Sequence, residues 1–272
     1  MLEIMLDEFH FSSLWNGGIL LFTLFGAIIY LFMLPNGKHH SIWKTIAFLG
    51  GLLISFLAIG SPLNIIARIQ FSAHVFQIAL LFFIAPPLLV IGFKTEILKR
   101  LFSIGIIAKI ARFITHPVVT IGVFYLLFYG YHHPPIFDFA RMDLYLNYFY
   151  LLGLFITAIL LWIPIIYPKQ MSILQRRMYL VGNIAVVLPL AVILITAKES
   201  LYTIYSDLGF FIKSLEACFP AGESLPPEYF QMLLPFNPVE EQFKGGIVLM
   251  AIQFFIFGML LVISFVRNRK QI

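Results

Sequence analysis

The chain has 272 residues, of which 61% are hydrophobic and 11% are charged, with a net charge of +5. Ordinary soluble domains carry about 25% charged residues, so this composition excludes an ordinary soluble domain and predicts an integral membrane protein. The single cysteine, Cys218, excludes an intrachain disulfide and a CxxC metal or redox motif.

Seven apolar runs are long enough to cross a bilayer, since a spanning helix needs about 20 apolar residues. They predict an all-α fold in which residues 1–272 form one membrane domain. The seven transmembrane helices are expected at about 14–34, 42–60, 69–93, 117–133, 144–166, 179–197 and 246–266. The first ten residues are acidic and lack a basic n-region, so the first run is not read as a cleaved signal peptide.

The connecting segments differ sharply in charge. With the N-terminus outside, the inner segments hold 13 basic residues and one acid, Glu96. Cytoplasmic loops of membrane proteins are enriched in Lys and Arg, so we predict the N-terminus outside and the C-terminus inside. The basic residues are Lys38, Lys44, Lys94, Lys99, Arg100, Lys109, Arg112, Lys169, Arg176, Arg177, Arg267, Arg269 and Lys270.

Two connections are more than turns. Residues 95–114 mix apolar and basic residues, a pattern typical of an amphipathic helix on the inner leaflet or of a plain basic connector. The outer connection between helices 6 and 7, residues 198–245, is long for a loop. Ser206 and Asp207 are expected to cap a short helix that runs to about Phe219, and the segment is expected to cover the outer helix ends.

The third span carries polar residues along one face. Gln70, His74 and Gln77 are spaced i, i+4 and i+7, so a helix places them together. Pro86 and Pro87 follow in the inner half of this span. The preceding Asn64 and Arg68 follow a Ser-Pro turn, which favours a role in starting a helix.

Histidines at the outer ends of two spans predict a metal site. His74 lies near the start of the third span, and His132 and His133 close the fourth. Spans joined through an inner loop are usually neighbours, so we expect these histidines to meet. Imidazole suits copper, zinc and iron, and Asp138 and Cys218 are further donors in outer segments. A purely structural role for each residue remains open, as do ion pairs of Arg141 with Asp138 and Asp143.

Other functions fit the same residues less well. His74 and His132 are also compatible with axial haem ligands in a redox protein. A zinc hydrolase would use His74, His132 and Asp138, but no spaced HxxxH motif is present. Acids lie almost wholly outside the spans, which disfavours a proton-coupled transporter, and the usual hydrolase, nucleotide and nucleic-acid signatures are missing. We therefore expect a non-enzyme that binds no nucleic acid.

Residues 60–92, GSPLNIIARIQFSAHVFQIALLFFIAPPLLVIG, resemble the signature of the cytochrome c oxidase assembly factor CtaG family. The resemblance continues through His116-Pro117, YHHPPIFDFA and EEQFKGG, and so covers most of the chain. Ile78 stands where many members have a second histidine, and Glu241 stands where members commonly have Asp.

The resemblance implies a seven-span protein of the cell (plasma) membrane that helps to assemble a haem-copper oxidase. Its expected partners are oxidase subunits and the lipid bilayer, and its expected cargo is copper. We expect copper at the outer face on His74 and His132, with His133 as a weaker candidate. Gln77, Asp138, Gln242 and Cys218 are expected to support the site. No oligomeric state is predicted.

Overall fold

The fold is taken from a computed structural model of the chain. The structure describes residues 9, 11–35, 40–94, 96–97, 103–167, 171–219, 226, 228 and 237–269, with side chains to residue 266. Within these ranges the regular secondary structure is helical. The helices are α2 (Phe11–Leu14), α3 (Gly17–Ile28), the π-helix η1 (Ile29–Met33), α4 (Ile42–Gly60), α5 (Leu63–Ile69), α6 (Phe71–Ala79), the π-helix η2 (Leu80–Ile84), α7 (Ala85–Gly92), α9 (Gly105–Ile114), α10 (Pro117–His132), α11 (Pro134–Met142), α12 (Leu144–Ile166), α13 (Ile173–Thr196), the 3₁₀ turn η3 (Thr203–Tyr205), α14 (Leu208–Glu216) and α16 (Pro238–Arg269).

Five predicted spans correspond to helices that are long and apolar enough to cross a membrane: α4, the run α6–η2–α7, α12, α13 and α16. The predicted spans 42–60 and 144–166 have the bounds of α4 and α12. The helices α13 and α16 begin six and eight residues before the predicted spans, because polar first turns continue them. Ser172 forms a capping box with Gln175 at the start of α13, and Asn237 accepts a hydrogen bond from the Val239 amide at the start of α16.

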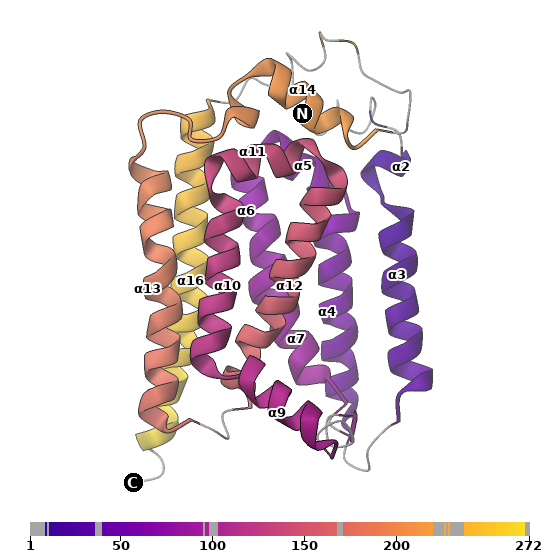
Figure 1. Ribbon diagram of the computed structural model, residues 1–272, viewed down its shortest axis with the longest axis vertical. Helices are drawn as coiled ribbons and strands as arrows, with labels where there is room; N and C mark the ends of the chain where they lie inside the picture. Colours follow the sequence, from indigo (N-terminus) through magenta and orange to yellow (C-terminus); the bar gives the residue numbers. More distant parts are fainter. Residues whose placement is uncertain are drawn as a thin grey trace.

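The other two predicted spans are less regular. The helices α9 and α10 are bent by 61° at a short break, and together they make one further candidate span. Residues 17–33 form a shorter apolar helix that also runs along the bundle (Figure 1). Among the described residues the structure therefore supports five to six spans. The count of seven and the orientation in the membrane stay predictions.

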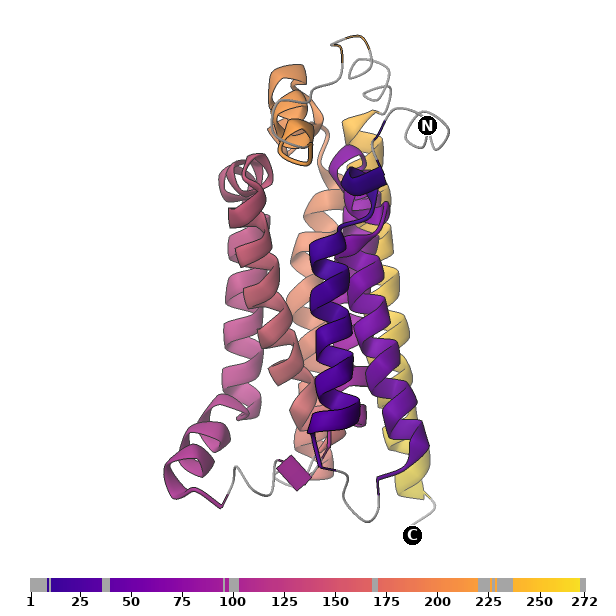
Figure 2. The ribbon, with the colours of Figure 1, turned by 90° about the vertical axis from the view of Figure 1, so that its right-hand side faces the viewer.

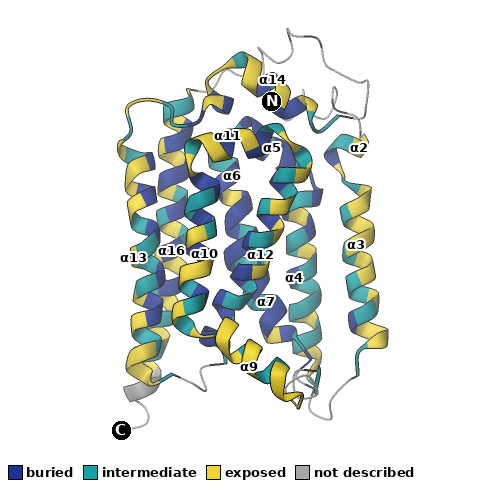
Figure 3. Cartoon of the chain, viewed as in Figure 1, coloured by how far each residue is buried: buried dark blue, intermediate teal, exposed yellow. Residues whose placement is uncertain are grey.

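The run α6–η2–α7 is the central helix. In its most apolar stretch 67% of the residues are buried, against 39% or fewer in the other four long helices. Figure 3 shows the same contrast, with α6 and α7 largely buried and α3 and α9 largely exposed. The signature segment thus forms the core of the bundle.

The two prolines of the central helix leave one carbonyl without a helical partner. Phe82 O would accept from residue 86 in an α-helix and from residue 87 in a π-helix, and both Pro86 and Pro87 lack an N–H. The indole of Trp162, on α12, donates to this carbonyl instead, at 3.1 Å from Nε1 to O. The Pro-Pro break is therefore stabilised by a side chain from a neighbouring helix.

Close helix contacts occur at glycines. A Cβ atom on Gly92 would lie 2.5 Å from Lys44 O and from Phe48 N of α4. A Cβ atom on Gly246 would lie 2.9 Å from Ala191 O of α13. These glycines let α7 and α16 approach their neighbours closely.

One end of the bundle is covered by short helices, and we call it the capped end. The helices α5, α11 and α14 lie across it with η3 (Figures 1 and 2). Asp207 caps α14 through a hydrogen bond from the Phe210 amide, 3.0 Å, as predicted, although α14 ends at Glu216. Phe211 and Leu215 of α14 pack with Ile65 and Ile69 of α5 in a small buried cluster. The described part of residues 198–245 covers helix ends, as expected, and the assignment of these ends to the outer side stays a prediction.

The opposite end carries α9. Its apolar side chains Ile106, Ile110 and Phe113 are exposed, and Lys109 and Arg112 lie on the same helix. This composition agrees with the amphipathic helix predicted within residues 95–114, of which 95 and 98–102 lie outside the described residues.

Candidate functional site

His74 and His132 lie side by side inside the capped end. Their ring centroids are 5.8 Å apart with an angle of 43° between the ring planes. His74 belongs to the first turn of α6 and His132 is the last residue of α10. The exposed fractions of the two residues are 0% and 4%. The expectation that these two histidines meet is confirmed.

Each imidazole is held through Nδ1. The Nδ1 atom of His132 lies 2.8 Å from Phe128 O, and because a carbonyl only accepts hydrogen bonds, Nδ1 carries the proton. The Nδ1 atom of His74 lies 3.4 Å from Gln77 Oε1. Both Nε2 atoms are buried and have no hydrogen-bond partner. This tautomer leaves the Nε2 lone pairs available, as in metal-binding histidines.

The amide of Gln77 is itself fixed. Its Nε2 donates to Ala58 O at 2.8 Å and to Asn64 Oδ1 at 3.0 Å. These donated bonds leave Gln77 Oε1 as the acceptor that faces the His74 ring. Asn64, which the sequence pattern assigns to a helix start, therefore supports the histidine through Gln77.

Aromatic rings enclose the pair. The Phe137 ring centroid lies 5.1 Å from that of His74 and 6.0 Å from that of His132. Tyr131 and Phe128 also contact the His132 ring, at 5.1 and 4.3 Å between centroids. A haem with these histidines as axial ligands would need its macrocycle between the two rings. The Phe137 and Tyr131 rings pack around the pair, so a macrocycle there would have to displace them, and the haem alternative stays a prediction.

Two candidate ligands are not part of the pair. His133 is exposed, and its carbonyl accepts from the first turn of α11. Cys218 is a free, half-buried cysteine that packs with the apolar cluster under α14. Among the described residues no three His, Cys, Asp or Glu side chains gather closely enough to hold a metal ion. The site therefore offers two protein nitrogens.

Asp138 and Gln242 support the cap. The carboxylate of Asp138 accepts from the backbone amides of Thr203 at 2.9 Å and Ile204 at 3.2 Å. Gln242 Oε1 accepts from the Leu201 amide at 2.9 Å. Both side chains fix the segment that follows α13, so Asp138 does not join His74 and His132 as the third ligand of a hydrolytic zinc site. Ile78 is fully buried in the apolar core.

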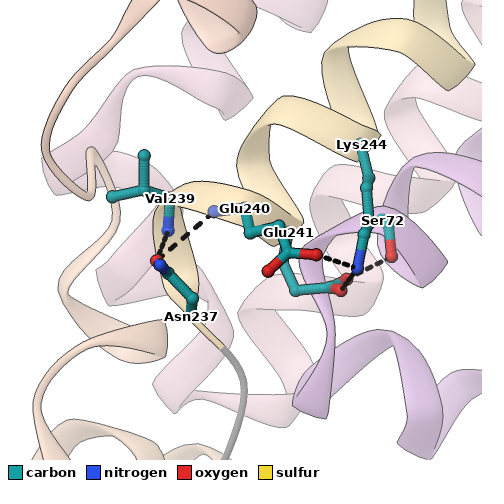
Figure 4. Close-up of polar contacts among 6 residues, drawn as sticks. All are labelled: Ser72, Asn237, Val239, Glu240, Glu241 and Lys244. Atoms are coloured by element: carbon teal, nitrogen blue, oxygen red, sulfur yellow. Dashed lines mark hydrogen bonds and ion pairs between the residues drawn. The ribbon is translucent and has the colours of Figure 1, made fainter.

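A further side-chain contact joins the start of α6 to the start of α16. Ser72 Oγ on α6 donates to Glu241 Oε2 on α16, and Lys244 Nζ lies 3.1 Å from Glu241 Oε1 (Figure 4). Glu241 is 6% exposed. The first turn of the helix that carries His74 is thus bonded to the start of α16.

The arrangement suits an ion with few ligands. Metal–nitrogen bonds are about 2 Å long, so one ion held by two Nε2 atoms places imidazole centres about 6 Å apart. The observed separation of the ring centroids, 5.8 Å, allows such an ion where the two Nε2 atoms face each other. Imidazole is a copper ligand, and Cu(I) is stable with two or three donors. A structural zinc site normally has four protein ligands, and this pair offers two.

Residues 25–271 match the family model described as cytochrome c oxidase caa3 assembly factor (Caa3_CtaG). The chain belongs to this family. The match covers nearly the whole chain and confirms the family resemblance that its motifs indicated. No curated protein and no solved structure matches the chain significantly. Membership assigns the chain to oxidase assembly. Its several long apolar helices indicate a multi-pass membrane protein.

Proposed function

We propose that this assembly factor accepts copper on His74 and His132 and passes it to a subunit of a haem-copper oxidase. The proposal rests on the pair of buried imidazoles whose Nε2 atoms have no hydrogen-bond partner. A buried polar atom without a partner costs free energy, and a bound ion would remove that cost at both rings at once.

The protein residues prepare the site before an ion arrives. Gln77 and the Phe128 carbonyl hold the two Nδ1 atoms, which fixes the ring planes and the tautomer. The aromatic rings exclude water. Two protein nitrogens leave coordination positions open on the ion, so a ligand from the receiving subunit can bind before a histidine leaves. Transfer by ligand exchange follows from this incomplete ligand set.

The proposed face is the outer side of the plasma membrane. The one-sided distribution of basic residues supports an orientation in which the capped end lies outside, since α9 and the first turns of α4 and α13, which carry described basic residues, lie at the opposite end (Figure 1). In this orientation the histidine pair faces the compartment in which a receiving domain would project from the membrane.

Copper binding to the purified protein tests the proposal. We expect one Cu(I) per chain, bound at least tenfold more weakly after His74→Ala or His132→Ala. The matched control is His133→Ala, because His133 is adjacent in sequence but exposed, and it should bind copper like the wild type. Unchanged binding in both of the first two variants would refute the site.

The role in assembly is tested in cells. A strain without the protein should contain oxidase with less copper and less activity, and wild-type protein should restore both. The His132→Ala protein should fail to restore them while being present in the membrane at wild-type level. Fully metallated and active oxidase in the deletion strain would refute copper delivery.

A further inference from the structure

Two arginines cross beneath the cap beside the histidine pair. Arg68 of α5 and Arg141 of α11 are both 0% exposed. Arg68 Nη1 donates to Arg141 O at 2.6 Å and to Ser214 O at 2.7 Å. Arg141 Nη2 donates to Ala67 O and, at 3.4 Å, to the Tyr205 hydroxyl. Arg68 therefore binds the backbone carbonyl of Arg141, and Arg141 binds the carbonyl of Ala67, the residue before Arg68.

The carbonyls that accept these bonds lie at helix ends. Ala67, Arg141 and Ser214 are in the last turns of α5, α11 and α14. The last carbonyls of a helix lack helical partners and carry partial negative charge. Three converging C-termini explain why two positive side chains gather here. They account for one nitrogen of each guanidinium.

The remaining nitrogens have no partner. Arg68 Nε and Nη2 and Arg141 Nε and Nη1 are buried and make no hydrogen bond. In the part of the chain that the structure describes, neither arginine forms an ion pair with Asp or Glu, and the Asp138 carboxylate is bound by backbone amides. Burying a charge without a counter-charge is expensive, so this cluster is incomplete in both charge and hydrogen bonding.

The neighbouring side chains do not supply the missing charge. Burial raises the pKa of Tyr205 to about 12, so its hydroxyl stays protonated and donates to Ala67 O at 2.9 Å. Phe137 covers the guanidinium of Arg141, with 5.7 Å between Cζ and the ring centroid. A bound anionic group would supply the acceptors and the counter-charge that the described side chains leave out.

The free nitrogens of Arg68 define which group fits. Nε and Nη2 lie on one edge of a guanidinium, and this edge binds two oxygens of a carboxylate or a phosphate side by side. We propose that Arg68 and Arg141 form a binding site for an oxyanion, a carboxylate or phosphate group, held on the Nε–Nη2 edge of Arg68. Arg141 adds the second positive charge and two further donors. The site does not depend on the copper proposal.

Thermal unfolding of the purified, metal-free protein in neutral detergent tests this site. Phosphate and acetate are compared with chloride at equal ionic strength and pH. A ligand that binds the folded state raises the melting temperature, so we expect a saturable rise of several degrees with at least one of the two oxyanions. Arg68→Lys keeps the charge and a donor for the carbonyls but lacks the two-nitrogen edge, and it should lose the rise. Arg112→Lys, on the exposed surface of α9, should keep it.

Direct binding decides the question without relying on the variants. Equilibrium dialysis of the wild type against radiolabelled phosphate or acetate should show about one bound oxyanion per chain, and the more strongly retained ion identifies a phosphate or a carboxylate as the natural group. Binding of neither ion, or an equal rise in melting temperature for wild type and Arg68→Lys, would overturn the proposal.

Discussion

Replacing Gln77 by methionine tests the support of the histidine pair. Methionine has a similar length and no amide, so His74 loses the acceptor for its Nδ1 hydrogen. The ring is then free to rotate and to change tautomer, and Nε2 is no longer kept free for a ligand. We expect Cu(I) to bind more weakly, although both histidines are still present.

The size of the effect follows from the contacts. Loss of a partner that orients a metal ligand usually weakens affinity by about 10–100-fold. The bond from His74 Nδ1 to Gln77 Oε1 is long, 3.4 Å, so we expect the lower limit, about tenfold or about 1.4 kcal/mol. Folding stability should fall as well, by about 1–3 kcal/mol, because Ala58 O and Asn64 Oδ1 lose a buried donor.

Competition with a chromogenic Cu(I) chelator measures this affinity on folded protein. The matched control is Gln253→Met on α16, since Gln253 is also buried but neither of its amide atoms has a hydrogen-bond partner. That variant should bind copper like the wild type. An affinity of Gln77→Met within twofold of wild type, or an equal loss in both variants, would refute the reasoning.

Three further changes test the fold by thermal or denaturant unfolding. Trp162→Phe should cost about 1–3 kcal/mol, because Phe82 O then stays unpaired in the core. Gly92→Ala should cost about 1–3 kcal/mol, because its methyl group would meet the backbone of α4 at 2.5 Å. Asp138→Asn should cost about 1–3 kcal/mol, since an amide replaces one of the two oxygens that accept from Thr203 and Ile204.

Each of these changes has a control in the chain. Trp43 is 74% exposed, so Trp43→Phe should leave stability within about 0.5 kcal/mol. Nothing lies within 4 Å of a Cβ atom on Gly50, so Gly50→Ala should stabilise by up to about 1 kcal/mol. Asp143 is an exposed N-cap, where Asn serves about as well. Losses as large in the controls as in the test variants would contradict these assignments.

The sequence allowed the long helices to be predicted because their apolar runs are long and their ends carry caps or prolines. It located α4 and α12 to the residue. The start of α13 was missed because Arg176 and Arg177 lie inside its first turns, and basic residues end an apolar run without ending a helix. The bend between α9 and α10 has no comparable signal in hydropathy.

The site was predicted in part. His74 and His132 could be paired because they lie on neighbouring spans and at the same membrane face. Gln77 could be placed beside His74 because the two residues share a helix face. The contacts of Asp138 and Gln242 could not be predicted. Backbone amides are commoner partners of such side chains than metal ions are, and contacts with backbone amides leave no pattern in the sequence. Arg68 and Arg141 lie 73 positions apart in helices too short to predict, so their crossing appears only in three dimensions.

The tyrosines of η3 have a kinetic consequence for the proposed metal transfer. Tyr202 donates from its hydroxyl to His132 O at 3.1 Å, and Tyr205 donates to Ala67 O at 2.9 Å. Both Nε2 atoms are buried, so in the proposed function a donor atom from another protein reaches them only after the cover over the pair moves, and these two hydroxyls fasten η3 of that cover to α10 and α5. For the proposed copper transfer we therefore expect loading and release to be limited by the rate at which η3 detaches. On that proposal the turnover of the site is set by a conformational rate, and a tighter cap would make a slower carrier of equal affinity.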